Sequence, residues 1–484
     1  YCNPFNPGGI VENIAGHRQV TPGHTSCPGD RLLNLLPGIR QRVRDRMGGA
    51  PPPDPGTARL EVLGVRYDRQ DLAAGELLKV TFTVRNSGQV AIEGQAPEAA
   101  RRPDQQGGFD LADSYVYDEA ECFLGDPGQV TPAFPKEPGR FRVLLGPADS
   151  ARMPACAGDA GGYPWRWGIN GPLAPGETRE VVGYLLLRTP GPLALQAGAI
   201  HEYVDYMGRD LAGATVTVGP ERQAPAPAAY DAALRPLAHV YRLGEVPDNL
   251  LARTANPAAV ARGAYVGSFP WAGELRDWGE GGPLPGAPEL VDRFVIEQTR
   301  AFVAPVAGTY TFQLASDDGG WLWVNGRLVV SHPGLHDAST PATGTVELAA
   351  GRHVLAFKMF ERSGGAAAGY SVRAPGSAEF ITPADGLAAG ERLGATFRRL
   401  EGLAIAADDL GGSGVARLRV SLNGGPWQEQ AGPLLELGPF APGAHTVRYV
   451  AVDGAGNSSP EGVISFRIDP DLVVMSTHLP AITR

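Results

Sequence analysis

Short runs in which apolar and polar residues alternate recur along most of this chain and are separated by turn-forming residues. Residues 78–84 read Leu-Lys-Val-Thr-Phe-Thr-Val, and residues 308–314 read Gly-Thr-Tyr-Thr-Phe-Gln-Leu. A period of two places every second side chain on the same face of a strand, whereas an amphipathic helix needs a period near 3.6. The pattern therefore predicts a mainly β chain built of β-sandwiches.

The composition agrees with several β-domains in series. The chain has 484 residues, of which 65 are glycine and 44 proline, and charged residues make up 19%. This length is enough for about three or four domains of ordinary size. Many turn residues and few charges are typical of β-domains that are joined by stiff linkers rather than of helical bundles.

Charge and hydropathy exclude two classes of partner. The formal net charge is −10 and the isoelectric point is near 5.5. Because phosphate binding needs a basic face, we expect no nucleic-acid partner. No apolar run approaches the roughly 20 residues that a helix needs to span a bilayer, so we predict no membrane span.

Shifts in composition predict seven segments. The clearest boundary is residues 51–56, Pro-Pro-Pro-Asp-Pro-Gly, which favour extended polyproline geometry, and a second proline- and alanine-rich stretch follows residue 219. The predicted segments are a first piece at 1–48, a linker at 49–57, a β-domain at 58–219, a linker at 220–238, a β-domain at 239–375, a β-domain at 376–470 and a tail at 471–484.

A loop near the start of the chain brings together a histidine, a cysteine and hydroxyl side chains. His17 and Cys27 are of the residue types that zinc prefers as ligands. They are too far apart in sequence to share one helical face, so spacing alone leaves open an ordinary surface loop with a buried cysteine. Asp30 is a good N-cap for a helix that begins at Leu32 and Leu33.

Residues 1–48 resemble the closing third of a type-2 N-acetylmuramoyl-L-alanine amidase or peptidoglycan recognition domain. The resemblance rests on Asn-Ile-Ala-Gly-His-Arg at 13–18 and Thr-Ser-Cys-Pro-Gly-Asp at 25–30. It implies that His17 and Cys27 bind zinc and that Thr25 is a catalytic-site residue beside the reacting carbonyl. The family's first zinc histidine and its tyrosine lie upstream of these motifs. We therefore expect a truncated α/β remnant that is inactive alone and belongs to a longer parent protein.

Residues 58–219 look like an immunoglobulin-like sandwich with a long insertion. Cys122 and Cys156 fall within this domain and are candidates for a disulfide, with two unpaired thiols as the alternative. Tyr163, Trp165 and Trp167 are expected to pack in the core, although such a cluster can also stack against a sugar.

Residues 239–375 resemble the PA14 (protective-antigen-type) β-sandwich from end to end. The resemblance rests on Asp277-Trp278-Gly279, on the strand before Asp317-Asp318-Gly319-Gly320, on the Asn325-Gly326 turn and on the strand at 355–360. In glycan-binding members the paired aspartates coordinate calcium, often across a cis peptide bond. Asp317 and Asp318 are thus predicted calcium ligands, since calcium takes several oxygen ligands. A purely structural polar turn is the alternative.

The last domain resembles the bacterial immunoglobulin-like modules of secreted proteins. Its pattern runs from Asp408-Asp409 through the Asn423-Gly424 turn to Asp453-Gly-Ala-Gly-Asn457. Here the acidic side chains are expected to hold turns by hydrogen bonds to nearby backbone N–H groups rather than to bind metal.

Taken together, these features predict a fragment of a secreted or cell-surface bacterial protein. The parent is predicted to be a zinc amidase that cleaves peptidoglycan and carries a carbohydrate-binding PA14 domain, with zinc and calcium as cofactors. Its partner would be peptidoglycan or another cell-surface polysaccharide. The alternative is a non-catalytic protein that binds glycans or serves as a spacer.

Overall fold

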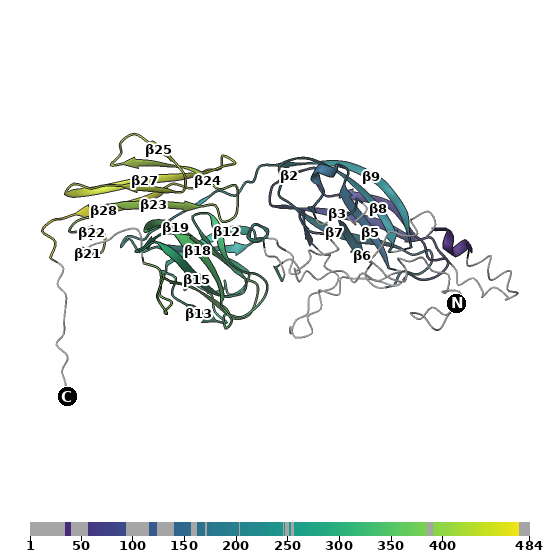
Figure 1. Ribbon diagram of the computed structural model, residues 1–484, viewed down its shortest axis with the longest axis horizontal. Coiled ribbons are helices and arrows are strands. Elements are labelled where there is room, and N and C mark those ends of the chain that lie inside the picture. Colours follow the sequence, from purple (N-terminus) through teal and green to yellow (C-terminus); the bar gives the residue numbers. More distant parts are fainter. Residues whose placement is uncertain are drawn as a thin grey trace, which may run out of the picture. The chain divides into compact units, whose positions relative to one another are not determined.

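The chain is described by a computed structural model. The described residues are 34–39, 57–92, 116–122, 140–155, 162–169, 172–202, 204–244, 246, 251–252, 256–384 and 391–473. The regular secondary structure of these residues is almost entirely β-strand, which confirms the predicted mainly β class (Figure 1). Residues 34–39 are helical, within the predicted helical region. His17, Thr25 and Cys27 lie outside the described residues, so their roles stay predictions.

The first compact unit contains a two-sheet sandwich, and from Gly219 onward the chain belongs to a second unit. One sheet has the order β1 (Leu60–Tyr67), β3 (Glu76–Asn86), β7 (Thr178–Leu187) and β4 (Val116–Asp118). The other has the order β2 (Asp71–Ala73), β9 (Asp205–Gly219), β8 (Gly191–His201), β5 (Phe141–Pro147) and β6 (Trp165–Gly168).

The aromatic residues of this unit fill its core, as the sequence predicts. Tyr163, Trp165 and Trp167 are all buried. The Trp167 ring contacts Phe82 and Tyr117 of the opposite sheet, with ring centroids 5.9 and 5.4 Å apart. These side chains therefore hold the two sheets together and offer no sugar-stacking surface. Cys122 is buried and disulfide-bonded, and its candidate partner Cys156 lies outside the described residues.

The second unit begins with a ten-stranded sandwich. Its larger sheet has the order β12 (Arg262–Pro270), β11 (Leu237–Leu243), β14 (Phe294–Ala304), β19 (Gly351–Glu361), β16 (Gly320–Val324) and β17 (Arg327–His332). Its smaller sheet has the order β13 (Arg276–Gly279), β20 (Ala366–Arg373), β15 (Gly308–Asp317) and β18 (Ala342–Leu348). The alternation in β15 buries Tyr310, Phe312 and Leu314 between the sheets.

The turn between β16 and β17 forms where the sequence predicts it. Asn325 and Gly326 have φ angles of 51° and 76°. Two central residues with positive φ match the right-handed twist of the flanking strands, and Asn followed by Gly tolerates this conformation best. The Asn325 side chain also accepts a hydrogen bond from the Val354 N–H at 2.9 Å, which ties the turn to β19.

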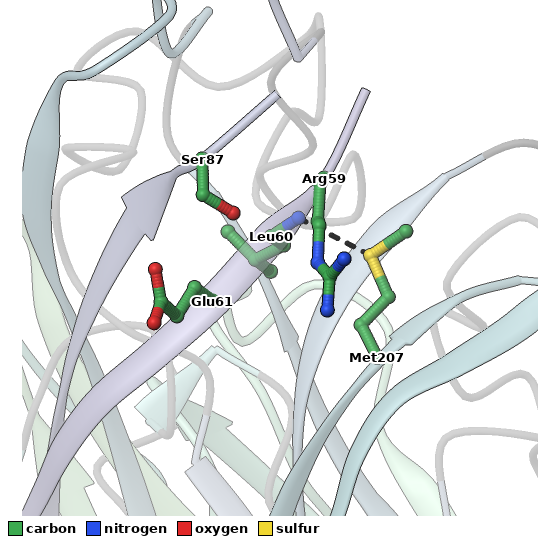
Figure 2. Close-up of a pocket in the computed structure, with 5 residues that line it drawn as sticks. All are labelled: Arg59, Leu60, Glu61, Ser87 and Met207. Atoms are coloured by element: carbon green, nitrogen blue, oxygen red, sulfur yellow. Dashed lines mark hydrogen bonds between the residues drawn. The ribbon is translucent and has the colours of Figure 1, made fainter. Parts of the chain in front are cut away.

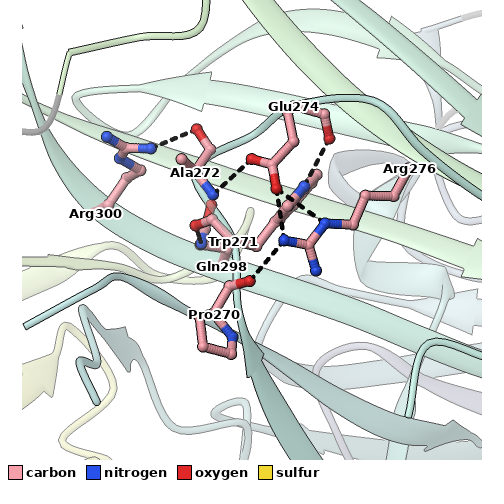
Figure 3. A network of polar contacts seen from close by, with 7 residues as sticks. All are labelled: Pro270, Trp271, Ala272, Glu274, Arg276, Gln298 and Arg300. Atoms are coloured by element: carbon pink, nitrogen blue, oxygen red, sulfur yellow. Dashed lines mark hydrogen bonds and ion pairs between the residues drawn. The ribbon is translucent and has the colours of Figure 1, made fainter. Parts of the chain in front are cut away.

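Two polar side chains on the buried strand β14 donate hydrogen bonds to the loop that joins β12 to β13 (Figure 3). Gln298 donates from Nε2 to the Trp271 carbonyl at 2.8 Å, and Arg300 donates from Nη1 to the Ala272 carbonyl at 2.6 Å. Glu274 in turn accepts from the Ala272 N–H at 3.0 Å and from Arg276 Nε at 2.9 Å. Because buried polar groups without partners cost free energy, this network fixes the loop.

The C-terminal sandwich shares the second compact unit. One sheet has the order β10 (Ala226–Pro227), β23 (Leu403–Asp408) and β26 (Leu434–Leu437). The other has the order β21 (Arg392–Leu393), β22 (Thr396–Phe397), β28 (Gly462–Ile468), β27 (Gly443–Asp453), β24 (Val415–Leu422) and β25 (Gln428–Ala431).

The stretch at 220–238, predicted as a linker, carries β10 and the first residues of β11. Ala228 packs in a cluster of small side chains with Ala301 and Val354 of one sandwich and Ala404 and Ala406 of the other. The stretch is therefore packed against both sandwiches of the second unit.

Candidate functional site

The paired aspartates lie where β15 ends and β16 begins. Asp317 is the last residue of β15, and the peptide bond between Asp317 and Asp318 is cis. Position 319, directly after the pair, has room only for glycine. A Cβ atom there would lie 2.7 Å from the Phe360 ring and 3.0 Å from the Gly334 carbonyl oxygen. Close packing around Gly319 thus fixes the backbone directly after the two carboxylates.

Backbone N–H groups hold the Asp318 carboxylate in place. Oδ1 accepts from the His336 N–H at 3.1 Å, and Oδ2 accepts from the Arg362 N–H at 3.0 Å. The Asp318 N–H donates to the Phe360 carbonyl at 3.1 Å, which joins this turn to the end of β19. Asp318 is therefore oriented by two loops that are distant from it in sequence.

A third carboxylate, Glu361, joins the pair from the last position of β19. One oxygen from each of Asp317, Asp318 and Glu361 lies within 4.8 Å of the others. Glu361 is 0% exposed, and neither of its oxygens accepts a well-formed hydrogen bond from the described residues, although the nearby Ser363 N–H acts weakly on it. Sequence reasoning identified the strand up to Phe360 and missed Glu361. A carboxylate directly after a buried apolar strand is the signal that would have found it.

Burial raises the pKa of all three carboxyl groups, and the charges of neighbouring carboxylates raise those of Asp317 and Glu361 further. The pKa of Asp317 rises to about 7 through burial and the charge of Asp318. That of Asp318 rises to about 6 through burial, against the lowering effect of its two N–H donors. Burial, with the charges of Asp318 and Asp317, raises the pKa of Glu361 to about 10 against the weaker effect of the Ser363 N–H. Such a group is stable in charged form only with a cation nearby.

The charges around the trio are of both signs, since Arg362 and His336 lower the pKa of Asp318 while acidic neighbours surround Asp317. None of the three carboxylates forms an ion pair with a Lys, Arg or His among the described residues. The charges of Asp337 and Asp277 raise the pKa of Asp317 further, while His336 opposes them. The composition of the trio suits a hard divalent cation, which prefers carboxylate oxygens.

His332, the last residue of β17, and His336, in the loop that follows, are stacked on each other. The rings of His332 and His336 lie 3.6 Å apart between centroids. Burial, with the charge of His336, lowers the pKa of His332 to about 4. Since His336 also donates its backbone N–H to Asp318, this loop forms one wall beside the carboxylates.

A shallow depression in the first unit offers no comparable chemistry (Figure 2). Arg59, Leu60, Glu61, Ser87 and Met207 line it, and the Leu60 N–H donates to Met207 Sδ at 3.2 Å. These side chains include a single carboxylate, so they provide no convergent set of metal ligands. The trio of Asp317, Asp318 and Glu361 is the stronger candidate.

Comparison with known families identifies the domain that carries the trio. Residues 278–385 match the family model of the PA14 domain. The chain contains a PA14 domain. The matched residues include Asp317, Asp318 and Glu361, so the whole trio belongs to this domain. Among the curated proteins, no match is found.

Three solved structures with different descriptions are among those that match this chain. The PA14 sugar-binding domain from an RTX adhesin is 21% identical, and the match covers 34% of this chain and 99% of that one, with a TM-score of 0.25. The Epithelial Adhesin 9 A domain from Candida glabrata in complex with Galb1-3GlcNAc is 13% identical over 34% and 93% of the chains, with a TM-score of 0.24. An anti-sigma factor domain-containing protein is 14% identical over 48% and 99%, with a TM-score of 0.25.

The described part of the chain contains no helix that is long and apolar enough to cross a membrane.

Proposed function

We propose that the PA14 domain binds carbohydrate through a calcium ion held by Asp317, Asp318 and Glu361. The observation that carries the proposal is the convergence of three carboxylates, one of them buried and without a well-formed hydrogen bond from the described residues. Calcium takes six to eight oxygen ligands at roughly 2.3–2.6 Å, and adjacent carboxylates supply several of them with concentrated charge. The family match supports the same function.

The three residues would have different roles toward the ion. Asp318 and Glu361 are buried, whereas Asp317 is half-buried. The buried carboxylates would bind the ion from the protein side, and the N–H groups of His336 and Arg362 keep Asp318 in position. The rest of the coordination sphere would stay available to water or to sugar hydroxyls. Recognition of a diol by the ion, with selectivity from the surrounding loops, follows from this arrangement.

The predicted partner is peptidoglycan or another cell-surface polysaccharide, and the predicted location is secreted or on the cell surface. The resemblance of residues 1–48 to an amidase supports a parent enzyme that cleaves peptidoglycan with a zinc ion on His17 and Cys27 and with Thr25 beside the substrate carbonyl. Release of muropeptides from peptidoglycan, measured by chromatography of the digest, tests this part of the proposal.

A glycan array tests the carbohydrate proposal. The chain is applied with calcium and again with a chelator, next to the variant Asp317→Asn. The expected result is binding that requires calcium and is lost in the variant. Glu289→Gln is the matched control, because Glu289 is exposed and pairs only with Arg242 in the same domain. A chain that binds no glycan in calcium would instead favour the spacer function.

A further inference from the structure

A second group of three carboxylates lies in the C-terminal part of the second unit. One oxygen from each of Glu221, Asp409 and Asp453 lies within 4.8 Å of the others. Glu221 lies shortly before β10, Asp409 follows β23 and Asp453 ends β27. Three segments that are far apart in sequence thus meet at one point.

Each carboxylate is oriented by a nearby N–H group. Glu221 Oε1 accepts from the Ser413 N–H at 2.6 Å, and Asp409 Oδ2 accepts from the Gly414 N–H at 2.9 Å. Asp453 Oδ1 accepts from the Asn457 N–H at 2.7 Å, as the sequence predicts for a turn-holding aspartate. These bonds fix the directions of the carboxylates but use only part of their capacity to accept.

One oxygen in the group is buried and has no partner. Asp409 is 4% exposed, and its Oδ1 accepts no hydrogen bond from the described residues. A buried carboxylate oxygen without a partner costs free energy. We therefore expect this oxygen to bind a ligand that offsets the cost. Burial, with the charges of Glu221 and Asp453, raises the pKa of Asp409 to about 8. This is the direction expected where carboxylates converge without a cation.

No described cation neutralises this group. None of the three carboxylates forms an ion pair with a Lys, Arg or His in the part of the chain that the structure describes. Arg262 acts electrostatically on Asp409, but its own partners are Glu297 at 2.6 Å and the Ala224 carbonyl at 2.8 Å. The Arg262 guanidinium therefore binds Glu297 and the Ala224 carbonyl rather than Asp409.

The run Gly411-Gly412-Ser413-Gly414 makes room for the carboxylates. A Cβ atom on Gly412 would lie 2.6 Å from both Asp409 Oδ2 and Glu221 Oε2. The two oxygens therefore converge on one backbone position from which any side chain is excluded. Gly411 and Gly414 have φ angles of 95° and 85°, which glycine adopts without strain.

We propose that Glu221, Asp409 and Asp453 form a second cation site, which binds calcium and fastens the segment at 221–223 to the C-terminal sandwich. The all-carboxylate composition selects a hard divalent cation, and the buried Asp409 Oδ1 is the atom that would gain a partner. Asn457 already donates from Nδ2 to the Glu221 carbonyl at 2.9 Å, so the ion would complete an existing attachment. This role is structural and is independent of sugar binding.

The experiment counts calcium ions on the intact chain by equilibrium dialysis in a background of excess magnesium. The expected result is two ions on the wild type, one on Asp409→Asn, one on Asp317→Asn and none on the double variant. Glu221→Gln is a second test, because the amide oxygen can still accept from Ser413 while the charge is lost. Glu461→Gln, which removes an exposed partner of Arg448 in the same sandwich, should retain both ions.

The outcomes separate this proposal from the carbohydrate proposal. A wild type that binds one ion, lost in Asp317→Asn and retained in both Asp409→Asn and Glu221→Gln, would overturn the second site; Asp409 and Glu221 then share a proton instead. One ion lost in Glu221→Gln but retained in Asp317→Asn would support the second site and contradict the first.

Limited trypsin digestion gives an independent measurement. Arg222 is exposed and lies directly after Glu221. Calcium is expected to slow cleavage after Arg222 several-fold in the wild type and in Asp317→Asn. In Glu221→Gln calcium should have no such effect, and equal protection there would overturn the attachment role.

Discussion

The two carboxylate groups of the second unit have the same composition but differ in how the fold assembles them. Asp317 and Asp318 are neighbours in sequence, and only Glu361 comes from another strand. Glu221, Asp409 and Asp453 come from three separate segments. Each group contains a buried oxygen without a hydrogen-bond partner. A metal site can therefore be concentrated in one turn, or distributed so that it joins parts of the chain.

The two groups do not differ in exposure. Each has one half-buried carboxylate, Asp317 in the first and Glu221 in the second, and two buried ones. The difference in expected role rests on assembly alone: only the second group joins three separate segments of the chain. We therefore expect the first ion to exchange ligands with sugars and the second to serve the fold.

The largest expected effect is on glycan affinity. Asp317→Asn should weaken carbohydrate binding by roughly tenfold or more, because a missing metal ligand costs at least as much as the loss of an outer-shell partner. Asp409→Asn should leave the affinity unchanged within error. Surface plasmon resonance on the array's best ligand measures both. Equal losses in the two variants would show that the sites are not functionally distinct.

Calcium should also stabilise the fold at both sites. At a calcium concentration of 100 times the dissociation constant, each site contributes about 2.7 kcal/mol to the free energy of unfolding. Asp317→Asn and Asp409→Asn should each lose one such increment in calorimetric melts, and the double variant both. Full stabilisation of Asp409→Asn by calcium would contradict the second site.

The next largest effect is expected from adding one methyl group at Gly412, beside the second site only. Gly412→Ala would place Cβ 2.6 Å from two carboxylate oxygens and should destabilise the chain by about 1–3 kcal/mol while removing one calcium ion. Gly286→Ala is the control, since no atom lies within 4 Å of its Cβ position. Two bound ions on Gly412→Ala would mean that these oxygens do not form a site.

The smallest expected effect is on how the melting temperature depends on pH in the absence of divalent cations. A carboxyl whose pKa is raised by folding stabilises the fold while it is protonated, and this contribution is lost as the pH rises through the folded pKa. Those values are about 6 for Asp318, about 7 for Asp317, about 8 for Asp409 and about 10 for Glu361. The melting temperature in chelator should therefore fall as the pH rises from about 6 to 9, a range where ordinary carboxyls are already ionised.

Calcium binds the ionised carboxylates, so an excess of it should reduce this fall. The double variant Asp317→Asn, Asp409→Asn should show a smaller fall than the wild type in chelator. A melting temperature that rises with pH over the same range would contradict the raised pKa values.

Local patterns made part of this molecule predictable. The mainly β class, the strand before Asp317 and the Asn325-Gly326 turn all follow from short-range periodicity and turn chemistry. The paired aspartates were predicted as calcium ligands from the resemblance to glycan-binding PA14 domains, and the chemistry of adjacent carboxylates agrees with that prediction. The predicted zinc ligands His17 and Cys27 lie outside the described residues.

The two ligands that the sequence did not predict, Glu361 and Glu221, are brought to their sites by pairing between strands that are far apart in sequence. Glu361 reaches the aspartates because β19 runs antiparallel to β16, with Gly320 opposite Met359. Glu221 lies in a stretch whose composition is typical of a linker, and only the packing of β10 on β23 brings it near Asp409. Neither register is encoded by local periodicity, so both residues were missed as ligands.

Calorimetric titration of calcium into the wild type and Glu361→Gln tests the central claim most directly. Glu361 was identified by the structure alone, and its carboxylate has no described hydrogen-bond partner to lose. The account predicts that the variant folds, keeps the second ion and binds the first at least about tenfold more weakly. Unchanged affinity at the first site in Glu361→Gln would contradict the account.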